Sequence, residues 1–491
     1  MNESGKSDRL VVPANSSNKT GAVARVAEVG EGRGRAKGNT VDKTRPGHGA
    51  GPDALSALDR VREAARRSEG VRFTALLHHV DVDRLRAAYR GIRPKAAPGV
   101  DGLTWAEYGV DLEANLLDLH ARVQSGRYRA KPSRRVYVPK PDGRLRPLGI
   151  VSLEDKIVQR AVVQVLNAVY EVDFLGFSYG FRPGRGPHDG LDALAVGIER
   201  RRVNWVLDAD IRDFFTSLDR VWLKRFLEHR IADRRVLRLI DKWLAVGVVE
   251  DERWVACDEG TVQGASISPL LANVFLHYVF DLWVRWWRSN RARGDVIVVR
   301  FADDITVGFE YEDEARAFLV ELRERFARFG LELHPEKTRL IEFGRFAARR
   351  RSKRGSGKPQ TFDFLGFTHV CAKDRKGRFR LKRLSIAKRV RAKLHEVKDQ
   401  LRRRMHDPVP EQAKWLASVL TGHYNYYAVP GNIDAITAFR TEVTRLWFKA
   451  LKRRSQRTRL NWERMARLAK QCLPPARIRH PYPSERFAAR T

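Results

Sequence analysis

Cysteine is scarce in this chain of 491 residues, which contains only Cys257, Cys371 and Cys472. These three lie too far apart along the sequence to form the paired spacing of a zinc site or the framework of a disulfide-rich secreted domain. Such scarcity is typical of proteins in a reducing compartment, so we expect a cytoplasmic protein.

Long apolar segments are also missing. No uninterrupted apolar run reaches the roughly 18 residues of a membrane-spanning helix, and the polar opening Met-Asn-Glu-Ser predicts no signal peptide. Both absences argue against a membrane protein. Hydrophobic residues still make up 43% of the chain, which is enough for sizeable cores in roughly three domains of ordinary length.

Acidic residues are too few to balance the basic ones. Lys and Arg number 94 against 59 Asp and Glu, which gives a formal net charge of +35, spread along the chain. This surplus predicts a long polyanionic partner, most simply nucleic acid. Residues 1–53 are rich in Gly, Ser, Asn, Lys and Arg without an apolar period. We expect a disordered basic segment there, either a nucleic-acid tether or an inert tail.

Two adjacent acids stand between apolar runs at 296–307, where the sequence is Val-Ile-Val-Val-Arg-Phe-Ala-Asp-Asp-Ile-Thr-Val. The pattern predicts two strands joined by a tight turn that carries Asp303 and Asp304. A divalent cation would convert the repulsion of two such carboxylates into shared ligation, and oxygen-only ligands favour Mg²⁺ or Mn²⁺. The alternative is a pair of solvated loop acids.

A second strand, at 204–211, is predicted to be buried and to end in acids. Strand alternation places Asp208 and Asp210 on one face. If this strand neighbours the Asp303 strand in one sheet, the acids meet, and two Mg²⁺ ions between them would form the clamp used for nucleotidyl transfer. Phe215, shortly after Asp210, would then lie under the sugar of the incoming nucleotide.

A basic hairpin is predicted upstream, with strands on either side of an Asp-Gly turn at 142–143. It carries Lys140, Arg144 and Arg146. Cations at a hairpin tip can fold over a triphosphate, so this hairpin could bind the incoming nucleotide. The alternative is an ordinary solvated hairpin.

Motifs in a fixed order make the chain resemble the group II intron-encoded reverse transcriptases, or maturases. The resemblance covers roughly residues 55–485, and each motif is modest while the ordered set is specific. The motifs are Pro-Gly-Val-Asp-Gly at 98–102, Val-Pro-Lys at 138–140, Arg-Pro-Leu-Gly-Ile at 146–150, Ser-Tyr-Gly-Phe-Arg at 178–182, Asp-Ala-Asp-Ile at 208–211, Gln-Gly at 263–264, Ser-Pro-Leu-Leu-Ala-Asn at 268–273, Phe-Ala-Asp-Asp at 301–304, Glu-Lys-Thr at 336–338 and Phe-Leu-Gly-Phe at 364–367.

The resemblance implies an α+β fold, a right-hand polymerase followed by an α-helical thumb. Fingers and palm would occupy residues 54–370, and the thumb, called domain X in maturases, residues 371–470. Apolar residues at helical spacing within the basic stretch 373–404 favour helices after the palm. A basic, Pro-rich tail would follow at 471–491.

The resemblance also implies site residues. Asp210, Asp303 and Asp304 match the catalytic metal-binding triad, with the backbone carbonyl of Ile211 as a further ligand. Aromatic residues at 422–427 resemble the signature of domain X; they are candidate RNA contacts, with a buried helical core as the alternative. The remaining matches are Lys140, Arg146, Ile211, Phe215, Gln263, Gly264 and Lys337 around the nucleotide, Leu365, Gly366 and Phe367 in the primer-gripping turn, and Tyr424, Tyr426 and Tyr427 toward RNA.

The implied function is that of an RNA-directed DNA polymerase and intron maturase, with two Mg²⁺ ions for which Mn²⁺ can substitute. Its partners would be a group II intron RNA, a DNA target and primer, and deoxynucleoside triphosphates. It would assist splicing and copy the intron into cDNA during retrohoming, in a nucleoid-associated ribonucleoprotein. The sequence leaves a homodimer open.

Two alternatives remain open. One is a related bacterial reverse transcriptase of the retron, diversity-generating or defence type, and the other is a non-catalytic RNA-splicing cofactor, against which the three retained acids argue. The sequence shows no Cys-pair and His-Asn-His endonuclease module. We therefore expect no cleavage of a second DNA strand by the protein itself.

Overall fold

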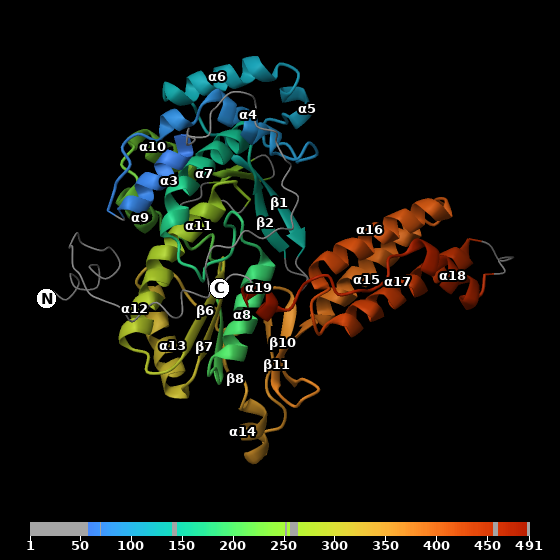
Figure 1. The fold of residues 1–491 in the computed structure, drawn as a ribbon. Coiled ribbons are helices and arrows are strands. Elements are labelled where there is room, and N and C mark those ends of the chain that lie inside the picture. Colours follow the sequence, from blue (N-terminus) through green and yellow to red (C-terminus); the bar gives the residue numbers. More distant parts are fainter. Residues whose placement is uncertain are drawn as a thin grey trace.

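The computed structural model describes residues 57–68, 70–139, 145–250, 253–255, 264–454 and 460–488. The basic segment predicted at 1–53, Lys140, Arg144 and Gln263 lie outside these ranges. Figure 1 shows a large body from which a bundle of helices, the helical arm, projects to one side. None of the helices in the described ranges combines the length and apolar character needed to cross a membrane.

A four-stranded antiparallel sheet, the central sheet, lies in the body with the order β6-β7-β3-β8. Successive residues of β6 face opposite sides, since Val296 and Val298 belong to one hydrophobic core and Val299 to another, against which Ile297 packs. Burial of both faces explains the continuous apolar run of this strand. The strands are β3 (Trp205–Asp210), β6 (Val296–Phe301), β7 (Asp304–Phe309) and β8 (Arg339–Glu342).

Helices cover both faces of the central sheet. On the Val298 side, one long helical segment is interrupted by a π-helical turn, η3. On the other side α8 packs against β6. The elements of the Val298 side are α11 (Ser268–Leu276), η3 (His277–Asp281), α12 (Leu282–Asn290) and α13 (Glu312–Ala327), and α8 spans Pro187–Arg200.

The upper part of the body in Figure 1 is helical and surrounds the long buried helix α7 (Leu153–Asp173). A second sheet, with the order β2-β1-β4-β5, contains the predicted basic hairpin as β1 (Ser133–Pro139) and β2 (Leu145–Ile150). The other elements here are α3 (Ala57–Arg67), η2 (Leu77–His79), α4 (Val82–Arg90), α5 (Trp105–Tyr108), α6 (Leu112–Gln124), α9 (Arg220–Arg230), α10 (Arg234–Ala245), β4 (Val248–Glu250) and β5 (Arg253–Val255).

A third sheet joins the body to the helical arm, and it corrects one prediction. The apolar spacing from residue 373 onward predicted a helix, and this prediction is wrong at 379–385, which form strand β11. The elements are α14 (Ala347–Lys353), β9 (Phe362–Phe364), β10 (Phe367–Lys373) and β11 (Phe379–Ser385), then α15 (Ala387–Arg403), α16 (Val409–Tyr427), α17 (Ile433–Arg453) and α18 (Trp462–Cys472) in the arm.

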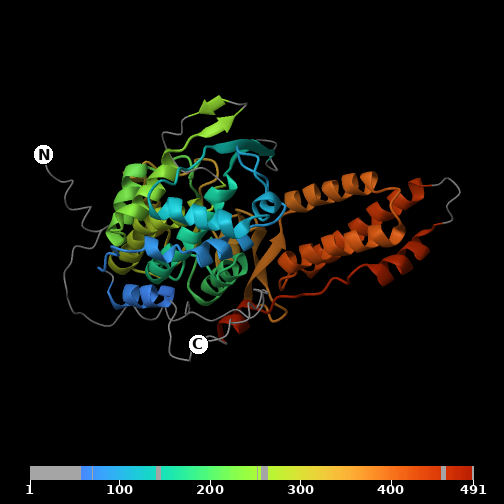
Figure 2. The same ribbon diagram turned by 90° about the horizontal axis from the view of Figure 1, so that it is seen from above.

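The C-terminal segment returns from the arm to the body. Figure 2 shows the arm extending away from the body and the chain running back along it. Helix α19 (Pro483–Ala488) then packs against α8, where the Arg486 guanidinium lies 3.3 Å from the Asp192 carboxylate. The segment predicted as a Pro-rich tail therefore contains a helix and connects the two parts of the molecule.

Candidate active site

The predicted acids lie on neighbouring strands of the central sheet. Asp210, the last residue of β3, is the register partner of Asp304, the first residue of β7. On its other side Asp304 pairs with Phe301 of β6, so β6 and β7 form the acidic hairpin with Ala302 and Asp303 between them. The prediction that the two acidic strands are adjacent is confirmed, and the hairpin is formed as predicted.

Close packing surrounds the turn of the acidic hairpin. Ala302 has a φ of 57°, in the left-handed region that non-glycine residues seldom adopt. Gly180 lies directly against this turn, since a Cβ at position 180 would be 2.2 Å from the Ala302 backbone nitrogen. Only glycine allows this approach, which explains a glycine in the Ser-Tyr-Gly-Phe-Arg motif.

A short segment after α13 runs alongside the end of β3 and delivers Lys337 to Asp210. The backbone N–H of His334 donates to the Asp210 carbonyl oxygen at 2.8 Å, and Ile211 forms a bridge with Leu333. The Lys337 Nζ then lies 2.5 Å from the Asp210 Oδ2. Lys337 therefore neutralises one acid of the site directly.

Burial raises the pKa of Asp303, and the charge of Asp210 adds to this effect, while Arg146 and Lys337 oppose it. The protein atoms packed around Asp304, followed by the charges of neighbouring carboxylates, raise its pKa to about 7. Asp304 is nevertheless exposed to solvent, so water weakens these electrostatic effects and a cation can reach the carboxylate. Three carboxylates beside one another make the site short of positive charge.

The donor set of this site is hard oxygen, which fits Mg²⁺ or Mn²⁺. In the described part of the chain, no three His, Cys, Asp or Glu side chains already stand as a metal-binding group. The backbones of Asp210 and Asp304 are adjacent, whereas the Asp210 carboxylate is bonded to Lys337. Holding an ion would therefore require this ion pair to open and the carboxylates to turn toward a common point.

Of the other residues predicted around the nucleotide, Arg146 lies near these acids, Gly264 lies against the basic hairpin, and Phe215 lies in the turn after β3. Arg146 is exposed on β2 and close enough to Asp303 to act on its charge. Gly264, with a φ of 113°, lies against β2, where a Cβ would be 2.7 Å from the Gly149 carbonyl oxygen. Phe215 is half-buried in the turn after β3 and packs edge-to-face on Phe214, 5.5 Å between centroids.

The predicted primer-gripping turn connects β9 to β10 and is bonded to the helical arm. Leu365 and Gly366 both have positive φ, 45° and 83°. The Tyr426 hydroxyl donates to the Leu365 carbonyl at 2.7 Å, and its ring stacks on the buried Phe367. Tyr426 therefore links the helical arm to the body.

Tyr424 lies in the core of the helical arm and is 0% exposed. Its ring therefore cannot stack on RNA, and the alternative prediction for this residue, a place in a buried helical core, is confirmed. The pattern of aromatic residues predicted a helix but did not distinguish its faces. Tyr427, in contrast, lines a surface cavity between α15 and α16.

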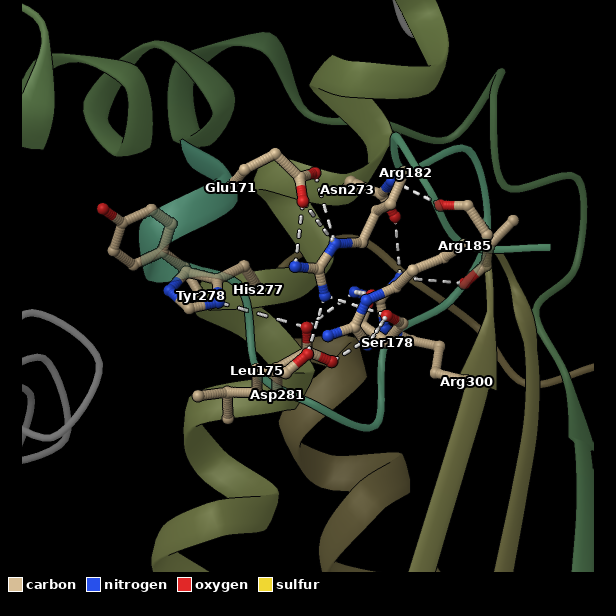
Figure 3. Close-up of polar contacts among 12 residues, drawn as sticks. Glu171, Leu175, Ser178, Arg182, Arg185, Asn273, His277, Tyr278, Asp281 and Arg300 are labelled. Carbon is tan, nitrogen blue, oxygen red and sulfur yellow. Dashed lines mark hydrogen bonds and ion pairs between the residues drawn. The ribbon is translucent and has the colours of Figure 1, made fainter. Parts of the chain in front are cut away.

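A buried polar network behind the acidic hairpin is not among the residues predicted from the sequence. It contains Arg300 of β6, Asp281 of η3, Asn273 of α11 and Ser178, drawn in Figure 3. A signal was present, because an arginine in an apolar strand and an aspartate in an apolar helix each need a buried partner. Only the tertiary structure pairs them.

Comparison with known proteins agrees with this geometry. Residues 138–369 match the family described as reverse transcriptase (RNA-dependent DNA polymerase). Over 245 residues the chain is 29% identical to the group II intron-encoded protein LtrA of Lactococcus lactis subsp. cremoris, covering 49% of this chain and 41% of that protein. Over roughly half of its length the chain is thus similar to reverse transcriptases, among them a group II intron-encoded protein.

Two further relatives cover different shares of the chain. Protein YkfC of Escherichia coli (strain K12) is 35% identical over 218 residues, 41% of this chain and 57% of that protein. An uncharacterized 91 kDa protein in the cob intron of Schizosaccharomyces pombe is 37% identical over 155 residues, 32% of this chain and 19% of that protein. The chain thus spans 57% of YkfC and smaller parts of the other two.

The fold is accordingly that of a right-hand polymerase, of mixed helix and sheet. The family match begins in β1 and ends in β10, so it includes the basic hairpin, the central sheet and the acidic hairpin. Reverse transcriptases generally use divalent metal ions, in keeping with the oxygen donors of this site.

Proposed function

We propose that the protein is an RNA-directed DNA polymerase whose catalytic acids are Asp210, Asp303 and Asp304. The observation that carries the proposal is the register of β3 and β7, which sets Asp210 opposite Asp304. Asp303 directly precedes Asp304 in the turn and is close enough to Asp210 to be affected by its charge. The test is primer extension with purified protein, an RNA template, a DNA primer and deoxynucleoside triphosphates. We expect cDNA that requires Mg²⁺ or Mn²⁺, and no extension in the presence of a chelator.

The three carboxylates, with the carbonyl of Ile211, would hold two Mg²⁺ ions. A bound pair of ions supplies activation of the primer 3′-hydroxyl and neutralisation of the leaving pyrophosphate. Lys337 and Arg146 add positive charge beside the acids, where it can stabilise a triphosphate. Lys140, Gln263 and Gly264 complete the proposed nucleotide contacts, with Phe215 beneath the sugar.

Removing one of the acids should stabilise the metal-free protein. Because the pKa of Asp304 is about 7, above the ordinary value of unfolded aspartate, the folded state binds more protons between about pH 4 and 7, and stability falls as pH rises through that window. At pH 8 in EDTA, Asp304→Asn should therefore raise the melting temperature by a few degrees. Differential scanning fluorimetry measures it.

Two controls accompany this stability measurement. At pH 5 the carboxyl is largely protonated, so the difference between wild type and Asp304→Asn should shrink. Mg²⁺ should raise the melting temperature of the wild type more than that of the variant, since ligation stabilises the state that binds it. A variant that melts below the wild type at pH 8 in EDTA would contradict the charge crowding described for this site.

We also propose that the protein is a maturase that binds its group II intron RNA, assists splicing and copies the intron. The support is the relation to intron-encoded proteins and the +35 net charge. Basic residues are dense on α15, which contains Lys388, Arg389, Arg391, Lys393, Lys398, Arg402 and Arg403. Binding should weaken steeply with salt, because each neutralised phosphate releases counterions.

A cavity of about 370 Å³ between α15 and α16 is a candidate nucleic-acid contact on the arm. Arg389 and Lys393 line it from α15, and Gly422 and Tyr427 from α16. Gly422 lies inside a 19-residue helix although a Cβ there would meet nothing within 4 Å. The chain itself does not require a glycine at this position, which costs helix stability, so the open space is available to a ligand.

Filling this cavity should weaken nucleic-acid binding without unfolding the arm. Gly422→Leu should lower affinity for intron RNA or primer–template about tenfold, the effect expected when one base or phosphate contact is lost. Gly422→Ala is the control, because it leaves room in the cavity and should raise helix stability by about 1 kcal/mol. Fluorescence anisotropy with each nucleic acid identifies the ligand, and equal affinity of Gly422→Leu and wild type for both would exclude the cavity.

A further inference from the structure

Arg300 is completely buried on β6, at 0% exposure, and all five of its N–H donors are used. Nε and Nη2 donate to the two carboxylate oxygens of Asp281 at 2.7 and 2.6 Å, and Nη2 also donates to the Ser178 hydroxyl at 2.7 Å. Nη1 donates to the Asn273 side-chain oxygen at 3.0 Å and to the Ala302 carbonyl at 3.1 Å. The guanidinium in Figure 3 is thus fixed from several sides.

The bond from Arg300 to the Ala302 carbonyl orients one peptide group of the acidic hairpin. That carbonyl belongs to the peptide that joins Ala302 to Asp303, so its direction sets where the backbone of Asp303 lies. The same network also reaches the turn through Gly180. The Asn273 amide donates to the Gly180 carbonyl at 2.8 Å, and Gly180 packs against the Ala302 nitrogen. Two contacts therefore hold a backbone conformation that is unfavourable for alanine by itself.

Asp281, the partner of Arg300, lies in an irregular turn of its helix. Residues His277–Asp281 form a π-helical turn between α11 and α12. Such turns are rare and often occur at functional sites, because the inserted residue changes which side chains face a neighbour. His277, 4.0 Å from Asp281, has a pKa lowered to about 3 by burial, so it stays neutral and leaves the pairing of Asp281 to arginine.

We propose that Arg300, fixed by Asp281, Asn273 and Ser178, is a positioning residue that sets the acidic turn so that Asp303 and Asp304 can hold divalent cations. It acts through the peptide between Ala302 and Asp303 and touches neither substrate nor metal. The proposal rests on the proposed polymerase function, which it deepens. If Arg300 only stabilised the fold, its removal would lower the melting temperature without changing the affinity of the site for Mg²⁺.

The test removes both members of the buried ion pair in the double variant Arg300→Met, Asp281→Leu. Replacing both partners with apolar residues is often tolerated, whereas removing one leaves an uncompensated buried charge. We expect a folded protein whose kcat for primer extension falls about 10- to 100-fold, with a similar rise in the Mg²⁺ concentration for half-maximal effect, the size of effect known for residues that orient metal ligands. The KM for deoxynucleotides should change little.

A matched control uses the buried ion pair of Arg230 and Asp173, 2.9 Å apart, which joins the end of α9 to the end of α7. Arg230 also donates to the Val71 carbonyl, so it bonds to backbone as Arg300 does. Arg230→Met with Asp173→Leu removes a similar pair away from the acids. It should lower the melting temperature as much as the test variant does, with kcat and Mg²⁺ dependence unchanged. If both double variants lose activity in proportion to stability alone, the positioning role is refuted.

Two further measurements keep the proposal decidable. If the double variant fails to fold, Ser178→Ala removes one bond to Arg300 and should still raise the Mg²⁺ requirement severalfold; a requirement equal to that of the wild type would refute the proposal. The Mg²⁺-induced rise in melting temperature needs no polymerase activity, so it tests positioning even if the wild type does not extend primers. Absence of extension by wild type would refute the proposed function, whereas equal Mg²⁺-induced shifts in wild type and variant would refute the inference.

Discussion

Asp303→Asn should reduce primer extension by about 10³-fold, since metal-assisted charge stabilisation contributes several kcal/mol and each 1.4 kcal/mol is a factor of ten. The substitution keeps the shape of the side chain and removes one charged ligand from a site whose acids lie side by side on β3 and the acidic hairpin. The measurement is the single-turnover rate of cDNA synthesis at saturating primer–template. Asp241→Asn, at a half-exposed surface ion pair with Lys224, is the control and should extend primers normally.

The same variant should still bind intron RNA and promote its splicing at near-physiological Mg²⁺. Folding of an intron requires binding energy from basic and aromatic surfaces, which do not depend on the carboxylates. If Asp303→Asn extended primers at the wild-type rate, the assignment of the acids as catalytic would be overturned. Loss of splicing together with polymerisation, with RNA affinity intact, would show that the two functions share one site.

The sequence allowed prediction of the acidic hairpin and its neighbour strand, because both signals are local. The β-branched run before Asp303 favours a strand, and the acid at the end of the second strand, Asp210, requires a partner. The register between Asp210 and Asp304 agrees with that prediction. Similarly, the Asp-Gly turn predicted the basic hairpin, whose strands pair from Arg134 with Ile150 onward.

Predictions were wrong or missing where a polar residue is buried by a distant partner. The prediction of a helix at 379–385 is wrong because Arg383 interrupts the apolar alternation of Phe379 and Leu381. Arg383 is 2% exposed and bonded to Asp192 at 2.7 Å, so it belongs to the buried face of the strand. Arg300 was overlooked as a functional residue for the same reason. No local pattern links a strand arginine to an aspartate of η3, or an aromatic such as Tyr424 to one helix face.

Gly180→Ala should nearly abolish primer extension although it adds a single methyl group. A Cβ at this position would be 2.2 Å from the Ala302 nitrogen and 2.9 Å from the Phe301 carbonyl carbon, and backbone atoms cannot move aside as a flexible side chain can. The acidic turn would have to shift, and a displacement of about 1 Å in a catalytic group costs roughly 10²-fold in rate. The effect should appear in kcat and in the Mg²⁺ requirement, measured in primer extension.

Gly190→Ala provides the matched control for this substitution. Gly190 lies on α8, where an added Cβ would make ordinary contacts of 3.6 Å with Tyr179 and 3.7 Å with Leu365. Its alanine variant should keep activity and gain helix stability. Because the predicted shift of Gly180→Ala is confined to the turn, RNA binding by the arm should persist in both variants. Normal kinetics for Gly180→Ala would mean that the acidic turn tolerates displacement, and that neither Gly180 nor Arg300 is needed to position Asp303.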